Sequence, residues 1–212
     1  MAKFIGLIRT TAVVGLITAV LTLSFLVVSP KATLALVEPG SEIEYPDEVM
    51  LNDGEVDYNL VITGVGLREK TFLKIDVYAI ASYVAEGTEL GEEQGLALVV
   101  ADVPKELRMN ILRNFGREKL IKSFSDVIND NYDDTSGFDA EMTTFFDYFV
   151  NDAKDGDTLL FSYLPGTGLT THLNGELKGV ITNTAFVEAL WTVWFGEDPA
   201  NKGLRADLLS QM

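Results

Sequence analysis

The sequence of 212 residues contains no cysteine and a single histidine. Without cysteine the chain forms no disulfide, no thiolate zinc site and no cysteine nucleophile. His172 stands in a strand-like stretch with no serine motif beside it, so we interpret it as a strand residue and not as a catalyst. The acidic loops lack the spacing of a calcium-binding loop, and GVGLRE lacks the third glycine of a dinucleotide fingerprint. We therefore predict neither a metal nor a cofactor.

Basic residues are also scarce. The chain has 16 lysines and arginines against 32 aspartates and glutamates, which gives a net charge of −16. A field of this sign repels nucleic acid and anionic lipid headgroups, so neither is a predicted partner. An anionic ligand would need a local cation to hold it against that field. The apolar share of 47% is ample for a folded core, and the length fits one domain.

The first 35 residues differ from the rest of the chain. Lys3 and Arg9 precede an uncharged apolar run over 10–29, and small residues follow up to Ala35. This order is typical of a secretory signal that is removed after Ala35. A retained anchor is the alternative, because the run has 20 residues and roughly 20 are needed to span a bilayer. Both interpretations place the body outside the cytoplasm, in the periplasm or secreted, with membrane contact only through an uncleaved N-terminal segment.

Removing residues 1–35 removes Lys3, Arg9 and Lys31 and no acidic residue, so the body carries 13 basic and 32 acidic residues and a net charge of −19. Residues 36–48 are polar and contain proline, and we expect them to form an extended lead-in to a domain over 49–212.

Strands are predicted at the start of this domain. Asn52-Asp53-Gly54 is a turn signal between two strand-like stretches. Residues 72–84 alternate, which places Ala79, Ala81 and Tyr83 on one face and Tyr78 on the other. A further short strand is predicted over 96–102, in LALVVAD.

Helical spacing follows in the middle of the chain. Apolar residues from Pro104 to Asn131 recur every three or four positions, which predicts two helices separated by Gly116. A third helix is predicted over 138–150, where one side is rich in phenylalanine.

Strands return near the C-terminus. The stretches TLLFSYLP, GTGLTTHL and ELKGVIT are predicted strands, and Asn174-Gly175 marks a hairpin between the last two. Asn183 or Thr184 is expected to cap a helix that Gly196 ends, and LRADLL forms a last short helix. Strands, helices, a hairpin and a helix in this order indicate an α+β fold with a mainly antiparallel sheet.

Four stretches resemble, in their order, the chalcone isomerase-like family. They are GVGLR, VYAIASYV, LPGTGLTTHLNGELKGVI and FVEALWTVWFGEDPANKGLRADLL, and the resemblance runs from about residue 49 to residue 209. It implies a curved, mainly antiparallel sheet with helices packed on one side and a ligand cleft between the two layers. The family includes plant enzymes that close a flavonoid ring and non-catalytic members, among them fatty-acid binders.

The resemblance implies a ligand-binding role for Arg68, which follows Gly64 and Gly66. A guanidinium holds a carboxylate by two parallel hydrogen bonds, which a lysine cannot do. From the residues alone, Arg68 is more typical of a surface position than of a binding site. The two glycines let the backbone turn or let a ligand approach closely. Tyr78 matches the tyrosine of the fatty-acid binders and can donate to the same carboxylate, unless it packs at a core edge.

Apolar side chains of the helices, including Phe124 and Trp191, are expected to enclose the tail of the ligand. Trp191 also fits an ordinary core position, because Trp194 follows it three residues later.

The residues that would carry catalysis in the plant enzymes do not match. Val187 and Glu188 stand in place of a hydroxyl pair, and residues 122–131 offer Ser123, Asp126 and Asn129 without a tyrosine. We therefore predict no catalytic residue and non-catalytic binding of a small amphipathic carboxylate, a fatty acid. An isomerase or lyase acting on a phenolic or enone substrate is the first alternative, and an envelope accessory protein is the second.

Overall fold

The computed structural model describes residues 34–70 and 75–212. The predicted signal or anchor therefore lies outside the described residues, apart from Leu34 and Ala35. None of the helices in the two described ranges is long and apolar enough to cross a bilayer. The expected lead-in forms a small antiparallel hairpin of β1 (Ala35–Val37) and β2 (Glu44–Pro46).

A seven-stranded sheet forms the centre of the domain, and its strands are ordered as in the sequence. Every neighbouring pair is antiparallel. The strands are β3 (Glu48–Asn52), β4 (Asp57–Lys70), β5 (Ile75–Ala85), β6 (Lys105–Ile111), β7 (Thr158–Leu164), β8 (Gly168–Leu173) and β9 (Glu176–Ile181). Both predicted hairpins are confirmed. Asn174 and Gly175 have φ of 51° and 77°, as a two-residue hairpin turn requires.

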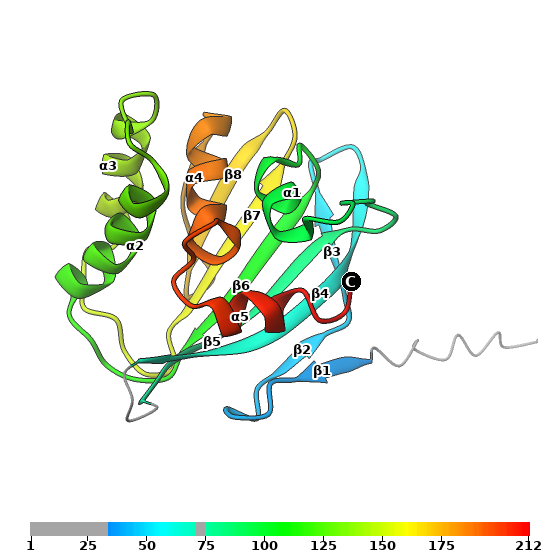
Figure 1. The fold of residues 1–212 in the computed structure, drawn as a ribbon, viewed down its shortest axis with the longest axis horizontal. Helices are drawn as coiled ribbons and strands as arrows, with labels where there is room; N and C mark the ends of the chain where they lie inside the picture. The colour runs from blue at the N-terminus through cyan, green and yellow to red at the C-terminus, as the bar shows by residue number, and fades with distance from the viewer. Residues whose placement is uncertain (1–33, 71–74) are drawn as a thin grey trace, which may run out of the picture. The chain divides into compact units, whose positions relative to one another are not determined.

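Five helices occur in the described residues, and Figure 1 shows them in front of the sheet, with the β1–β2 hairpin away from them. They are α1 (Gln94–Val100), α2 (Arg117–Asn131), α3 (Asp139–Asp147), α4 (Thr184–Phe195) and α5 (Lys202–Leu208). Asn183 caps α4, since its side chain accepts a hydrogen bond from the Ala185 N–H at 3.0 Å, and the helix ends at Gly196 as predicted. A curved antiparallel sheet with helices on one side confirms the predicted α+β fold.

The sheet buries both of its faces, and the alternation predicted for β5 is confirmed over residues 79–84 but not at Val77, where the strand pairing is irregular. Ile80 and Val84 pack with the helices in the larger core. Ala79, Ala81 and Tyr83 point the other way and pack with Tyr45 of β2. Because Tyr78 shares the face of Ile80, it lies on the helix side, where the resemblance places the ligand cleft.

Two predicted elements are wrong. Residues 96–102 are not a strand, because α1 buries Gly95, Leu98 and Val99 at helical spacing. The fully buried Lys105 donates to the carbonyls of Leu98, Val99 and Ala101 at 2.8–3.0 Å and so closes the end of this helix.

Residues 104–112 are not a helix but contain strand β6, which presents Leu107, Met109 and Ile111 to the helices. A spacing of four residues, as between Leu107 and Ile111, fits both a helix and a strand, so the apolar pattern did not separate them. Gly116 precedes α2 directly instead of separating two helices.

Candidate functional site

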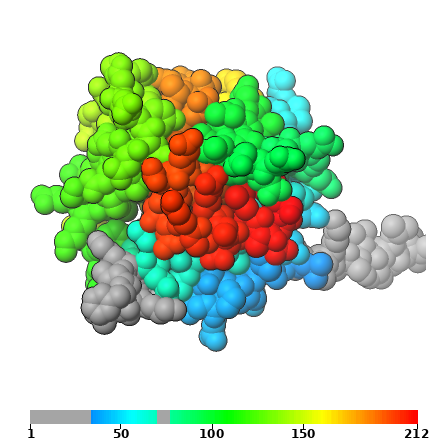
Figure 2. Space-filling model, in the orientation of Figure 1, coloured from blue at the N-terminus to red at the C-terminus, as the bar shows by residue number. Residues whose placement is uncertain are grey.

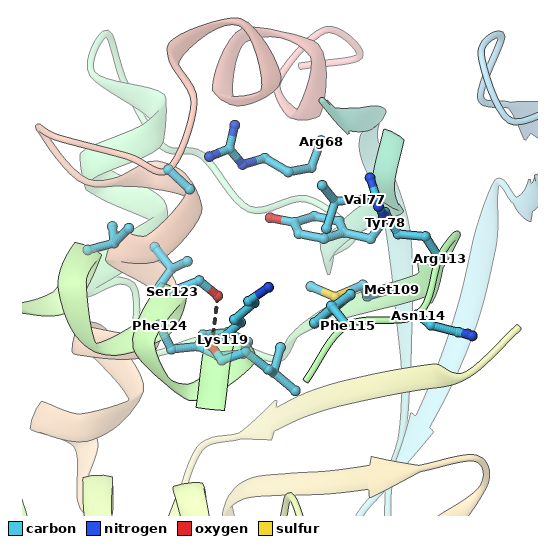
Figure 3. Close-up of a pocket in the computed structure, with 14 residues that line it drawn as sticks. Arg68, Val77, Tyr78, Met109, Arg113, Asn114, Phe115, Lys119, Ser123 and Phe124 are labelled. Carbon is cyan, nitrogen blue, oxygen red and sulfur yellow. Dashed lines mark hydrogen bonds between the residues drawn. The ribbon is translucent and has the colours of Figure 1, made fainter. Parts of the chain in front are cut away.

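A cavity of about 290 Å³ lies between strands β4–β6 and helix α2. Its sheet side includes Arg68, Tyr78 and Met109, and its helix side includes Phe124 and Val127. Figure 3 shows Arg68, Tyr78, Met109 and Phe124 around one space. We call it the Arg68 cavity. The structure thus brings together three of the four predicted site residues, Arg68, Tyr78 and Phe124.

Arg68 and Tyr78 are cross-strand neighbours, because β4 and β5 pair in a register that places them directly opposite each other. Directly opposite residues in an antiparallel pair project from the same face with their Cβ atoms close together. The register shifts just beyond this pair, where Glu69 is opposite Asp76. Val77 is the extra residue of this bulge, and it also lines the cavity.

The Tyr78 hydroxyl is polarised and positioned by its surroundings. It accepts a hydrogen bond from the indole N–H of Trp194 at 3.1 Å. Burial raises the pKa of Tyr78, while the charge of Arg68 and the Trp194 bond act in the opposite direction. The phenol therefore stays protonated at neutral pH. Within the described part of the chain its O–H has no acceptor, so this donor is available to a ligand.

Arg68 is half-buried, and its guanidinium keeps most of its N–H donors free. One of its nitrogens, Nη1, donates to the Glu69 carbonyl at 2.9 Å. Among the described side chains no carboxylate lies within ion-pair distance of it. A fork of unused N–H groups beside a phenol donor can receive one carboxylate by several hydrogen bonds.

Gly64 and Gly66 do not admit a ligand, because α5 fills the space in front of them. A Cβ on Gly64 would lie 2.2 Å from the Asp207 backbone oxygen, and one on Gly66 would lie 2.5 Å from Leu204 Cδ1. Figure 2 shows this C-terminal segment, in red, on the same side of the molecule as the helices. Arg68 is the next position on this face of β4, and it lines the cavity.

Phe124 forms an apolar wall of the cavity and is itself fixed by aromatic packing. Its ring lies 6.0 Å from that of Trp194 in an edge contact and 6.0 Å from that of Phe149 in a stacked one. Val193 of α4 also lines the cavity.

Trp191 does not line the Arg68 cavity. It is fully buried, and its ring lies 5.1 Å from the Lys105 ammonium. Trp194, three residues on, reaches the site through Tyr78 instead.

Two cations at the cavity, Arg113 and Lys119, were not found from the sequence. Arg113 follows β6 and Lys119 lies in the first turn of α2. They belong to elements that the sequence pattern assigned to one helical region, so no local signal placed them beside Arg68.

The residues at the positions of the plant catalytic set are dispersed. Glu188 lines a different cavity, with Asp102 and Tyr163. Asp126 pairs with Lys122 at 2.7 Å on the surface. Only Ser123 lines the Arg68 cavity, and its hydroxyl donates to the Leu120 carbonyl at 2.7 Å. No group of potential metal ligands occurs within residues 34–70 and 75–212.

Comparison with known proteins decides the family. A sequence profile described as chalcone isomerase-like matches residues 40–210. The chain belongs to the chalcone isomerase-like family. A search of curated proteins gives no match.

Among solved structures, this member of the family is similar to the fatty-acid binding protein AtFAP1 of Arabidopsis thaliana, with a TM-score of 0.65. The match covers 83% of this chain and 96% of AtFAP1 at 22% sequence identity. A likeness at this level of identity establishes the shared chalcone isomerase-like fold.

Proposed function

We propose that this protein binds a small amphipathic carboxylate, a fatty acid, in the Arg68 cavity without transforming it. The observation that carries the proposal is the cross-strand pair of Arg68 and Tyr78, whose donors face an apolar cavity. The carboxylate would receive the guanidinium fork and the phenol O–H, while the tail would lie against Phe124, Val127 and Val193. Ligand pockets are commonly of this kind, mostly apolar with a few convergent polar groups.

The charge balance of the chain supports the same head group. In a body with a net charge of −19, an anion is repelled everywhere except where cations gather. No acidic residue of the described chain lines the Arg68 cavity. A carboxylate is therefore attracted by the cations at the Arg68 cavity and repelled by the acidic remainder of the protein surface.

Binding is favoured over ring closure because a catalyst needs groups that bind the transition state better than the substrate. Asp126 and Glu188, which stand near the positions of the plant catalytic set, make their contacts outside this cavity. AtFAP1, which has the same fold, is a fatty-acid binding protein.

The test is calorimetric titration of dodecanoate into wild type, Arg68→Ala and Arg68→Lys. A hydrogen bond to a charged group contributes about 1.5–3 kcal/mol, so Arg68→Ala should weaken binding by about ten- to hundredfold. Arg68→Lys should recover only part of the loss, since the planar fork is absent. Lys122→Ala, on the exposed side of α2, is the control and should bind as wild type does.

Folding of each variant is checked by circular dichroism before titration. Absence of dodecanoate binding by wild type would reject the proposal. Equal binding by folded Arg68→Ala would reject the head-group role of Arg68 and leave only apolar contacts as the source of affinity.

A further inference from the structure

Three cations line the Arg68 cavity, whereas a carboxylate head carries only one negative charge. Arg68 projects from β4, Arg113 follows β6, and Lys119 projects from α2. In the view of Figure 3, Arg68 lies on one side of the Tyr78 ring and Lys119 on the other. Within the described residues none of the three has a carboxylate within ion-pair distance.

Other cavities of the molecule balance their cations with acids. Lys202 and Arg205 line a cavity of about 390 Å³ together with Glu92, Glu93 and Glu197. Lys178 lines another of about 410 Å³ and pairs with Glu176 at 2.7 Å. Among these cavities of the described residues, the Arg68 cavity therefore differs in having cations without acids.

Stability of the fold does not account for these cations. Like charges around one small cavity repel each other over distances below the Debye length of about 8 Å. Lys119 also stands in the first turn of α2, where the helix dipole disfavours a cation and favours an anion. An acidic chain has many carboxylates that could neutralise Arg113 and Lys119, yet none of the described ones is placed there.

We propose that the natural ligand of the Arg68 cavity carries a dianionic head, that of a phosphate monoester of an amphiphile. This inference rests on the proposed function and names its head group more closely. A phosphate monoester carries a charge of about −1.5 to −2 at neutral pH and offers three acceptor oxygens. Arg68 and Tyr78 hold one side of the head, and Arg113 and Lys119 neutralise the second charge. The apolar tail keeps its place against Phe124.

The experiment compares dodecyl phosphate with dodecanoate, which have tails of equal length, below their micellar concentrations and at one ionic strength. Wild type should bind dodecyl phosphate about tenfold or more tightly than dodecanoate. Arg113→Gln/Lys119→Gln should remove most of this preference and weaken the phosphate more than the carboxylate, because electrostatic attraction grows with the charge of the head. Lowering the pH from 7.5 to 5.5 should weaken the phosphate, whose second pKa is about 6, much more than the carboxylate, whose pKa lies at about 4–5.

A charge-matched control separates local contacts from the general field. Lys122→Gln/Lys154→Gln removes the same two charges from exposed positions outside the cavity and should keep the preference for phosphate. Equal affinities of wild type for both ligands, or loss of the preference in this control, would overturn the inference. If neither ligand binds, or if Arg68→Ala binds both as wild type does, the proposed function itself fails.

Discussion

Replacing Gly64 by alanine is expected to displace α5 from the sheet. The new Cβ would lie 2.2 Å from the Asp207 backbone oxygen and 2.7 Å from the Leu208 carbonyl carbon. These atoms belong to the helix backbone, so no side-chain rotation relieves the overlap and α5 must move as a unit. At Gly66 the nearest atom is Leu204 Cδ1, the end of a flexible side chain, and the next lies at 3.1 Å.

The cost of moving α5 follows from what holds it. Leu204 and Leu208 are at most 2% exposed. The Thr63 hydroxyl also donates a hydrogen bond to the Leu208 carbonyl at 2.8 Å. Overpacking a core costs about 1–3 kcal/mol, and exposing both leucines would cost about 3–6 kcal/mol. We therefore expect Gly64→Ala to lower the free energy of unfolding by at least about 2 kcal/mol, and Gly66→Ala by about 1 kcal/mol.

Urea unfolding of the two variants measures these losses, and hydrogen exchange reports the release of α5. Gly137→Ala is the matched control, because a Cβ there meets nothing within 4 Å and Gly137 has no positive φ. If Gly64→Ala is as stable as Gly137→Ala, α5 does not lie against β4 as described. If Gly66→Ala weakens dodecanoate binding while the free energy of unfolding is unchanged, the glycines are needed for the ligand to approach the sheet closely.

Two further predictions concern Lys105 and the N-terminus. Burial lowers the pKa of Lys105 to about 8 from 10.5, although Glu188 and Asp102 act to raise it. Between pH 8 and 10 the unfolded chain holds this proton and the folded chain does not, so the free energy of unfolding should rise by up to about 1.4 kcal/mol per pH unit. Urea unfolding across this range compares wild type with Lys105→Met, because burial raises the pKa of Tyr45, Tyr83 and Tyr163 and lowers the stability of both proteins alike as the pH rises. Wild type should gain stability relative to the variant, and parallel profiles would contradict the shift. We also propose export with cleavage after Ala35, so sequencing the mature protein should give Leu36 first, whereas an intact Met1 in the membrane fraction would indicate a retained anchor.

The elements predicted correctly are those whose boundaries depend on local chemistry. The Asn183 cap, the end of α4 at Gly196 and the Asn174-Gly175 turn each require one residue type in one backbone conformation. The short apolar run in α1 carries no such local marker. Its helix depends on packing against α4, which is distant in the sequence, and on Lys105 of β6, which donates to the carbonyls at its C-terminal end.

Part of the candidate site could also be predicted from the sequence. Alternation along β5 placed Tyr78 on the face opposite Ala79 and Ala81, and the resemblance pointed to both Arg68 and Tyr78. Arg68 and Tyr78 lie opposite each other because of the register between β4 and β5. The register shift next to this pair leaves no pattern in the sequence. Arg113 and Lys119 reach the cavity only because β6 and α2 are brought beside β4 and β5, which no local pattern specifies.

The position of Arg68 follows from where α5 ceases to cover β4. Gly64, Gly66 and Arg68 share one face of the strand, and α5 lies on the two glycines, which need their lack of a side chain. At Arg68 the cover ends and the cavity begins. A half-buried cation loses part of its hydration, and this loss is offset only when an anion or a set of acceptors replaces the water. Among the described residues Arg68 finds one carbonyl and no carboxylate. The fold therefore leaves at this boundary a half-buried charge without a carboxylate partner among the described residues, and this is where the proposed ligand head would bind.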